Sequence, residues 1–522
     1  MAVISLPVGL GLGQALGLTT IAVVLYHAFN IIYNLRFHPL SSFPGPLARR
    51  ASRLPYTLSI LNGRLHTDTA ALHRKYGPVV RVAPNELAFA DPSSWKDVMG
   101  GGSKELAKWG EAYLIPEFMP PHLQNTVDKE HHKMLRRAVA PGFSDQSLRA
   151  QEGLVAKYIN TLVERLRERC VAGGPSNGSF GQDAEKSGSG GPSAVVDMER
   201  WYRFTVFDII GDLALGESFG CLNGGDFHPW IKGVTDAGKV MWLLTAASMY
   251  PIAKKVSNWL FATVATRGFE MHNNMVKPMM ERRLAQGADR PDLINPIIMK
   301  KDEWNLTATD MISHATVFIG AGSETTAGVL TAVTSFLLDN PDKLDRLKQE
   351  VRPAFKSPAE ISLDAVNSRL PYLVACTEEA LRLYPQTGVP SLRISGDNDI
   401  ICGIPVPPKT VVGIWVWSMY RDPKLFANPD EFHPERFLGD PQYANDDRDA
   451  LKPFFTGTRD CIGRGLAVME LRLVLAHMIY NFDIELQPDS RHWTQDQKNL
   501  FIVWDKSPFN VRLRPVGHEA KA

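Results

Sequence analysis

The first thirty-five residues of this chain contain no Asp, Glu, Lys or Arg, and the first charged side chain is Arg36. From about Leu6 to Phe29 the segment is apolar except at four positions, which are Gln14, Thr19, Thr20 and His27. A helix of this length crosses the ~30 Å hydrocarbon core of a bilayer. A cleavable signal peptide needs a basic leading region and a shorter apolar core. We therefore predict an uncleaved single-pass membrane anchor over residues 1–35; the alternative is a buried hydrophobic helix.

The sequence after this span predicts an orientation and a hinge. Five arginines, from Arg36 to Arg64, precede the first acidic residue, Asp68. Positive residues that flank a span remain on its cytosolic side, so we expect the larger part of the chain to be cytosolic. Residues 36–48 contain three prolines, which cannot continue a helix. We predict a Pro-rich hinge over 36–48 and one large domain over 49–522.

Composition excludes several classes of protein. The chain has 57 Lys+Arg against 56 Asp+Glu, so it neither binds nucleic acid through bulk positive charge nor belongs to the highly charged disordered proteins. Its five cysteines are widely spaced and include no CxxC pair, which disfavours a disulfide framework and a Cys-rich zinc site. The stretch 173–193, rich in Gly, Ser and Pro, is typical of a surface loop.

The spacing of apolar residues predicts a mainly α-helical (α+β) fold. Apolar residues recur at helical spacing in four long segments, which are 144–170, 201–215, 256–284 and 307–338. Strand-like runs are shorter and lie nearer the ends of the chain, at 79–82, 86–90, 400–404, 411–416 and 499–504. We expect a large helical domain with a smaller β-rich region.

The most specific motif is the loop from Phe454 to Gly463, which reads FFTGTRDCIG. An iron-binding Cys thiolate needs a turn that brings backbone amides close to the sulfur. The glycines at 457 and 463 permit such a turn and the close approach of a flat macrocycle. A helix that begins near Gly463 would direct its N-terminus at Cys461 and favour the anion, and Arg459 can pair with a carboxylate of the ligand. The alternative is a buried structural Cys beside a turn, which leaves six matching positions unexplained.

Two further motifs lie within expected helices. Residues 321–326 read AGSETT, and a Gly in mid-helix costs about 1 kcal/mol relative to Ala. The adjacent side chains of Glu324 and Thr325 can loosen the helix and hold water near a ligand; the alternative is an ordinary packed helix rich in Ser and Thr. Glu379 and Arg382 are spaced i,i+3, which places them on one helix face within reach of a salt bridge.

Together these motifs resemble those of the cytochrome P450 family of haem-thiolate monooxygenases. The loop 454–463 is similar to the family's haem-binding signature, in which Cys461 matches the axial ligand to the iron of haem b (iron protoporphyrin IX). The string 321–326 is similar to the family's oxygen-activation motif. That similarity implies that Thr325 hydrogen-bonds the bound oxygen and that Glu324 feeds a proton relay.

The resemblance implies two further groups of residues. One is a structural network beneath the haem, formed by Glu379, Arg382 and Arg436. The other contacts the haem propionates or flanks the thiolate, and its members are His132, Arg136, Arg393, Arg459, Phe454 and Gly463. Many relatives have Trp where His132 stands. The alternative for Arg136 is a solvated helix face, and the alternative for the adjacent histidines is a metal site, which lacks nearby carboxylates.

The resemblance also implies an activity, a partner and a location. The expected enzyme inserts one oxygen atom from O2 into a C–H bond of a lipophilic small molecule. Residues 34–46 look like those of filamentous-fungal members, so we expect a secondary metabolite such as a terpenoid, polyketide or alkaloid. Electrons would come from a separate NADPH–flavoprotein reductase, because no FMN, FAD or NADPH module is visible. We expect the anchoring membrane to be the endoplasmic reticulum.

Two alternatives to this activity remain open. One is a haem-thiolate enzyme that catalyses isomerisation, dehydration, desaturation, ring formation or oxidative coupling without net hydroxylation. The other is a non-catalytic haem- or lipid-binding membrane protein, but such a protein should have lost Thr325 or the Glu379–Arg382 pair, and both are present.

The expected substrate pocket is apolar. By family position it draws on 109–122, Phe318, Ala321, 389–392 and 502–504. No role is predicted for the remaining cysteines, which are Cys170, Cys221, Cys376 and Cys402.

Overall fold

The computed structural model describes residues 12–101, 105–110, 122–172, 192–250, 253, 255–256, 274–287, 290–304, 306–495, 497–500 and 503–517. Most of the predicted loop 173–193 therefore lies outside the described residues. Besides the helices introduced in the next paragraphs, the described α-helices are α2 (Leu47–Ala51), α3 (Leu54–Leu61), α4 (Leu65–Tyr76), α5 (Ser94–Met99), α9 (Cys221–Gly224), α10 (Pro229–Ser248), α12 (Asn295–Lys300), α14 (Pro341–Ala354), α15 (Leu363–Arg369) and α17 (Val416–Met419).

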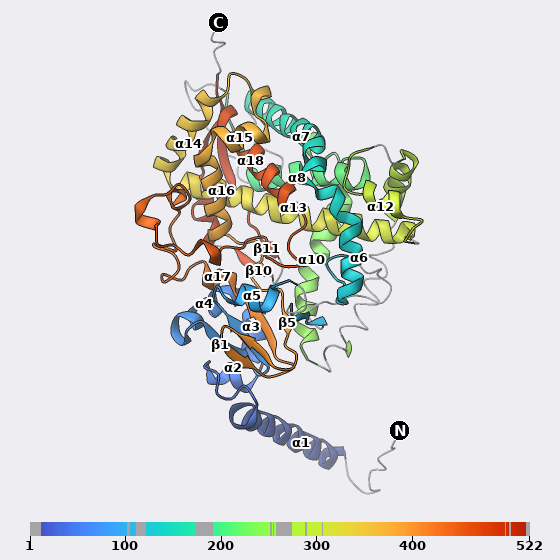
Figure 1. The fold of residues 1–522 in the computed structure, drawn as a ribbon, viewed down its shortest axis with the longest axis vertical. Coiled ribbons are helices and arrows are strands. Elements are labelled where there is room, and N and C mark those ends of the chain that lie inside the picture. The colour runs from blue at the N-terminus through green and yellow to red at the C-terminus, as the bar shows by residue number, and fades with distance from the viewer. Residues whose placement is uncertain are drawn as a thin grey trace.

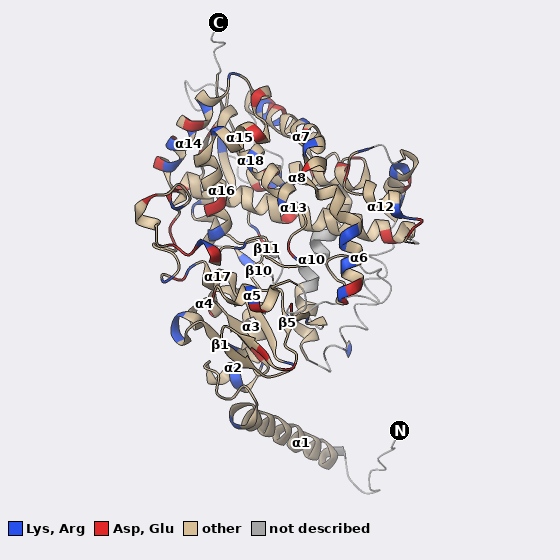
Figure 2. Ribbon diagram, in the orientation of Figure 1, with Lys and Arg blue, Asp and Glu red and all other residues tan. Residues whose placement is uncertain are grey.

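The N-terminal helix α1 (Leu12–Ile32) projects away from the rest of the molecule (Figure 1) and carries no charged side chain (Figure 2). The stretch Gly13–Phe37 has a mean hydropathy of 1.8 and is long and apolar enough to cross a membrane. The short π-helix η1 (Tyr33–Phe37) follows, and its side chains and backbone join it to the body. The Asn34 amide donates to a carbonyl of α2 at 2.9 Å, and the Arg81 guanidinium donates to the Asn34 carbonyl at 2.8 Å.

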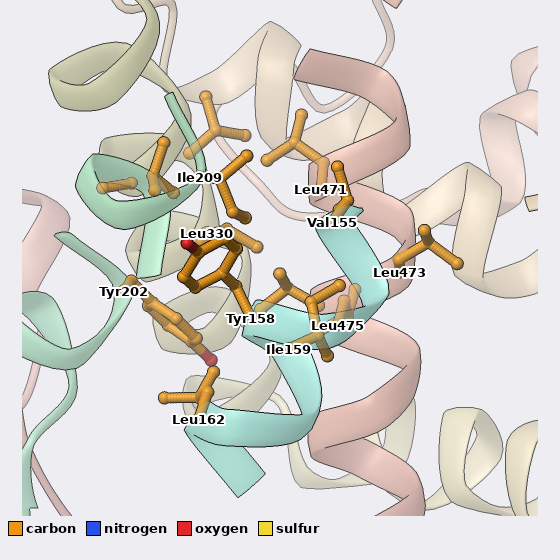
Figure 3. Close-up of a cluster of buried hydrophobic side chains, with 14 of the residues drawn as sticks. Val155, Tyr158, Ile159, Leu162, Tyr202, Ile209, Leu330, Leu471, Leu473 and Leu475 are labelled. Carbon is orange, nitrogen blue, oxygen red and sulfur yellow. The ribbon is translucent and has the colours of Figure 1, made fainter. Parts of the chain in front are cut away.

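The larger part of the molecule is a stack of helices around one apolar core. Its main members are α6 (Lys129–Val139), α7 (Asp145–Ala172), α8 (Met198–Leu215), α13 (Ala308–Asp339), α16 (Pro371–Leu383) and α18 (Arg464–Asn481). Figure 3 shows side chains from α7, α8, α13 and α18 packed together, among them Ile159, Tyr202 and Leu330. In α8 every side chain except those of Arg200 and Arg203 is buried, as expected of a helix enclosed on all sides.

These helices agree with the expected helical segments. The predictions for 144–170, 201–215 and 307–338 are confirmed by α7, α8 and α13. Helix α13 begins with a capping box, in which the Thr307 hydroxyl accepts from the Asp310 N–H and the Asp310 carboxylate accepts from the Thr307 N–H. Of the predicted helix 256–284, residues 274–284 are helical and 257–273 lie outside the described residues.

A five-stranded sheet lies at the end of the molecule nearest α1 (Figure 1). Its strands are, in spatial order, β1 (Val79–Ala83), β2 (Glu86–Phe89), β8 (Val411–Ile414), β5 (Arg393–Ile394) and β3 (Ala107–Lys108). Strands β2 and β8 pair in parallel, and the other neighbours pair antiparallel. Every residue of β1, β2 and β8 is buried, so packing covers both faces of this part of the sheet.

Three smaller sheets complete the described β structure. They are formed by β4 (Ala194–Asp197), β12 (Asn510–Pro515) and β9 (Phe482–Leu486), by β6 (Asp399–Ile401) with β7 (Ile404–Val406), and by β10 (Lys498–Leu500) with β11 (Val503–Asp505). The mainly helical fold with small sheets confirms the predicted fold class.

Three of the predicted strands have different limits in the structure. The run 400–404 is a hairpin rather than one strand, because Cys402 and Gly403 form its turn with φ angles of 51° and 74°. The run 411–416 leaves the sheet after Ile414, and α17 begins at Val416. The run 499–504 belongs to two strands, β10 and β11, which pair antiparallel.

Candidate active site

Cys461 lies in a loop that ends where α18 begins. Its backbone N–H donates to the Phe454 carbonyl at 2.9 Å, which closes the loop 454–461. Among the five cysteines, Cys461 alone has an exposed side chain; three are buried and Cys402 is half-buried. Desolvation by the surrounding protein raises the pKa of the Cys461 thiol, whereas the N–H of Gly463, the residue before α18, opposes that shift. A helix N-terminus therefore favours the thiolate, and a coordinated metal ion would deprotonate the thiol outright.

The two glycines of this loop, Gly457 and Gly463, differ in backbone conformation and in the space around them. Gly457 has a φ of 87°, and a Cβ atom added there would lie 1.9 Å from the Met99 carbonyl oxygen at the end of α5. Only glycine fits this position, in conformation and in space. Gly463 has a φ of −82°, and an added Cβ would lie 4.0 Å from the Cys461 sulfur. That is ordinary contact, so the protein atoms alone do not require glycine at 463.

Three of the four predicted propionate-binding residues, together with Lys108, surround the fourth, His132. His132 and Arg136 lie on α6, Arg393 on β5 and Arg459 in the Cys461 loop. Burial lowers the pKa of His132 to about 3, and repulsion by Arg459, Lys108, Arg136 and Arg393 adds to the shift. Lys108, on β3, was not predicted from the sequence. Burial first, and then Arg459 and Arg393, lower its pKa to about 7.

Two carboxylates face this cluster among the described residues: Asp460 pairs with Arg136, and Glu105 lies near Arg393 and Arg459. Glu105 is buried and lies 3.8 Å from Arg393 and 3.9 Å from Arg459. Positive charge exceeds negative charge here, which suits an anionic ligand. Arg136 and Arg459 also fasten the Cys461 loop, because Arg136 donates to the Asp460 carbonyl at 2.7 Å and Arg459 donates to the carbonyl of residue 126 at 2.6 Å.

On α13, the neighbouring side chains of Glu324 and Thr325 have different surroundings. The Thr325 hydroxyl donates to the Ala321 carbonyl at 2.7 Å in an exposed hydrogen bond, and the residue as a whole is half-buried. The Glu324 carboxylate accepts from Arg203 of α8 at 2.6 Å and from Lys506 at 2.9 Å. Burial alone would raise the pKa of Glu324, but the two cations outweigh it and lower the pKa to about 2. Glu324 is therefore ionised and held in ion pairs.

The motif 321–326 does not break α13, which runs as one continuous α-helix. Gly322 instead allows close packing, because an added Cβ would lie 3.3 Å from the Ile210 side chain of α8. Behind the motif lies Glu470 of α18, which is 2% exposed. Burial raises the pKa of Glu470 far above its ordinary value, although a hydrogen bond with Thr326 opposes the shift. Burial therefore disfavours the ionised form of this carboxyl.

Glu379, Arg382 and Arg436 form one buried network, and none of their side chains is exposed. Arg382 holds the Glu379 carboxylate through two hydrogen bonds of 2.7 and 2.8 Å. Arg436 reaches the same carboxylate at 3.0 Å and also pairs with Asp446. Arg382 further donates to backbone carbonyls of residues 420, 429 and 431. The network thus joins α16 to the irregular chain that leads to the Cys461 loop.

Comparison with known proteins identifies the family. The sequence model described as "Cytochrome P450" matches residues 49–513. This chain belongs to the cytochrome P450 family. It is 37% identical to a cytochrome P450 monooxygenase of Talaromyces wortmannii over 512 residues, 97% of this chain and 98% of the relative. It is 37% identical to the trichothecene C-15 hydroxylase of Fusarium sporotrichioides (97% and 98% covered) and to the averantin hydroxylase of Dothistroma septosporum (95% and 90% covered).

Membership of the cytochrome P450 family confirms the predicted haem-thiolate monooxygenase and its haem cofactor. Members use haem iron and need O2, a substrate and a redox partner. The described residues fit a haem. An exposed cysteine stands at a helix N-terminus, and beside it stands a largely buried group of cations, which outnumber the two carboxylates that face them. These are the two features that an axial thiolate and two propionates require.

The substrate pocket is described only in part, since residues 111–121 and 501–502 lie outside the described residues. Phe318 is buried and packs edge-to-face on Phe143, with ring centroids 5.4 Å apart. Val389 and Leu392 are buried in an apolar cluster with Trp109 at its margin. Trp504, which we expected near the pocket, is a core residue that stacks on Tyr384 at 5.0 Å.

Sequence reasoning missed the residues whose partners come from distant segments. Lys108 follows no motif, and its role emerges only when β3 and the Cys461 loop lie together. Glu470 carries a weak signal, because it is a lone carboxylate within the apolar run of α18. Glu199 gives a similar signal in α8, where it is buried among apolar residues.

Proposed function

We propose that this cytochrome P450 inserts one oxygen atom from O2 into a C–H bond of a lipophilic secondary metabolite, such as a terpenoid, polyketide or alkaloid. The observation that carries the proposal is the exposed Cys461 at the start of α18, beside the buried cation cluster. The names of two relatives, a trichothecene C-15 hydroxylase and an averantin hydroxylase, support hydroxylation as the reaction.

We assign the residues to three tasks. Haem, when bound, supplies the activation of O2. Cys461 holds the iron as a thiolate, with Phe454 and Gly463 on either side of it in the loop. The propionates would be bound by the cation cluster, whose members are Arg136, Arg393, Arg459 and Lys108, and by the neutral imidazole of His132 that lies among them. Glu379, Arg382 and Arg436 keep the loop and α16 in place.

In this proposal, Glu324 and Thr325 of α13 transfer protons. In the structure the Thr325 hydroxyl donates to the Ala321 carbonyl of its own helix. For proton delivery it rotates and donates toward the bound substrate instead. Glu324 passes protons to it from the protein interior. Because two cations hold Glu324, it must first loosen from Arg203 or Lys506 before it can take up a proton.

The partner and the membrane belong to the same proposal. An NADPH–flavoprotein reductase supplies electrons, and residues 1–35 anchor the protein in the endoplasmic reticulum with residues 49–522 in the cytosol. Residues 36–48 form the hinge between them. The uncharged α1 and the arginines that follow it support this orientation.

The test is reconstitution with the reductase, NADPH and a panel of lipophilic metabolites under isotopically labelled O2. We expect a product that has gained one labelled oxygen atom, detected by mass spectrometry. A product that has lost two hydrogens without oxygen would support desaturation or ring closure instead. The Cys461→Ser variant controls for reductase chemistry alone. NADPH-dependent turnover with no product from any metabolite class would contradict the proposed substrate.

A further inference from the structure

Behind α13, Glu324 belongs to a buried network of two carboxylates and two cations. The second carboxylate is Glu199 of α8, and Arg203 and Lys506 are the cations. The side chains of Glu199 and Lys506 are 6% and 5% exposed. Lys506 follows β11, so the network joins α8, α13 and the C-terminal strands. Such a group carries strong mutual electrostatic effects, because little water screens it.

The two carboxylates share the cations unequally. Glu324 lies 2.6 Å from Arg203 and 2.9 Å from Lys506, and Lys506 also donates to its backbone carbonyl at 3.1 Å. Glu199 lies 3.6 Å from each cation, and its Oε1 atom is buried without a hydrogen-bond partner. The cations are therefore committed to Glu324, while Glu199 stands close enough to compete for them.

The other groups around Glu199 do not offset the cost of burying its negative charge. Tyr384, at the end of α16, has a buried phenolic oxygen without a hydrogen-bond partner, and Glu199 contributes to raising its pKa after burial itself. Asp197, just before α8, accepts from the Phe509 N–H and further disfavours a negative charge on Glu199. Burial raises the pKa of Glu199 to about 7, although Lys506 and Arg203 oppose the shift. The two acids of one network thus titrate in different pH ranges.

We infer that Glu199 is a positioning residue for proton delivery, whose ionisation loosens the hold of Arg203 and Lys506 on Glu324. When Glu199 is protonated, two cations face one anion, and both bind Glu324. When Glu199 gives its proton to solvent, two cations face two anions, and either cation can turn to Glu199. Glu324 is then able to detach and to exchange protons with Thr325. The inference rests on the role proposed for Glu324.

The sign of the pH dependence follows. Coupling, defined as product formed per NADPH consumed, should rise as pH rises through neutrality, because Glu199 then ionises. The ionised fraction of a group with a pKa of about 7 increases about tenfold from one pH unit below that value to one above. Glu199→Gln, which is always neutral, should keep the low coupling of acidic pH across the whole range. Glu199→Asp should restore a slope.

The experiment measures coupling against pH for the full-length holoenzyme with saturating reductase. Asp208→Asn is the matched control, since Asp208 is another buried acid of α8, whose carboxylate caps the N–H groups of residues 221 and 222. Its pH profile should match that of the wild type. A wild-type inflection retained in Glu199→Gln would overturn the inference. The reduced-CO spectrum of each variant reports whether haem is bound.

Two further arms separate the possible failures. If Glu324→Gln leaves coupling unchanged, the proposed role of Glu324 fails, and the inference about Glu199 fails with it. If Glu324→Gln uncouples the enzyme but Glu199→Gln keeps the wild-type profile, only the inference fails. If Glu199→Gln does not retain haem, infrared spectra of the wild type and Glu199→Asp decide. In the wild type, the infrared band of a neutral carboxyl should disappear between pH 6 and 8, and in Glu199→Asp this band should shift. If neither protein shows such a band, the inference is refuted.

Discussion

At the scale of single residues, the α13 motif shows how neighbours in sequence acquire different chemistry. Successive helical residues point about 100° apart, so Glu324 turns to the buried cations of α8 and the C-terminal strands, while the Thr325 hydroxyl donates back to the Ala321 carbonyl of its own helix. Sequence alone places both residues in one motif and suggests one shared environment. The structure separates them into an ionised, ion-paired carboxylate and an accessible hydroxyl.

Thr325→Ala should uncouple the enzyme without loss of haem. We expect product formation to fall roughly tenfold, about 1.4 kcal/mol in activation free energy, and the share of electrons lost as hydrogen peroxide to rise. The measurement is peroxide and product per NADPH. Thr331→Ala is the control, because its buried hydroxyl also donates to the carbonyl four residues earlier on α13, at 2.9 Å. Equal peroxide release in both variants would argue against the role of Thr325.

Glu379→Gln should destabilise the fold by about 3–5 kcal/mol and release haem, because it leaves Arg382 and Arg436 buried without their counter-charge. Denaturant unfolding and haem content give the readout. The matched control is Glu168→Gln, which breaks the exposed i,i+3 pair with Arg165. That change should cost less than about 1 kcal/mol. A similar small loss in both variants would contradict the structural role.

Residues within a motif could be predicted from the sequence, whereas residues recruited from elsewhere could not. Cys461 and the Glu379–Arg382 pair lie in local motifs whose residue spacing is visible in the sequence. Lys108 acquires its role from packing between β3 and the Cys461 loop. The residues that surround Lys108 in the sequence do not indicate that contact. Long-range packing decides such positions.

At the scale of elements, the Cys461 loop depends on how closely it approaches α5. Gly457→Ala should prevent haem binding, because its φ of 87° is unfavourable for a side chain and an added Cβ would collide with the Met99 carbonyl oxygen. Gly439→Ala separates the two causes, since Gly439 has a φ of 82° but open space around it. We expect the control to lose about 1 kcal/mol in stability and to keep its haem. Haem content and thermal unfolding measure the difference; full haem content in Gly457→Ala would contradict the packing argument.

Long periodic elements were predictable, and short turns between strands were not. The helices α7, α8 and α13 follow their apolar spacing over many turns. The hairpin at 399–406 looks like one strand because its turn consists of Cys402 and Gly403, and a non-glycine residue at positive φ gives little warning. The end of β8 at Ile414 was equally hidden, since α17 continues the apolar run.

At the scale of the whole molecule, the anchor should be separable from the catalytic body. A variant that lacks residues 1–32 keeps η1 and the Asn34 contacts with α2 and Arg81. We expect it to leave the membrane fraction on alkaline extraction and to retain its haem, whereas the full chain stays in the pellet. A deletion of residues 1–48 also removes the Asn34 contacts and should unfold at a lower temperature. Membrane retention of the shorter deletion would refute the anchor at 1–35.

The central claim is that Cys461 binds the haem iron as a thiolate. The most direct measurement is the reduced-CO difference spectrum of the purified protein, with Cys402→Ser as the control for a half-buried cysteine outside the site. We predict that the wild type and Cys402→Ser show the red-shifted Soret band of thiolate ligation and that Cys461→Ser lacks it. A band typical of histidine ligation in the wild type, or an unchanged band in Cys461→Ser, would contradict the account.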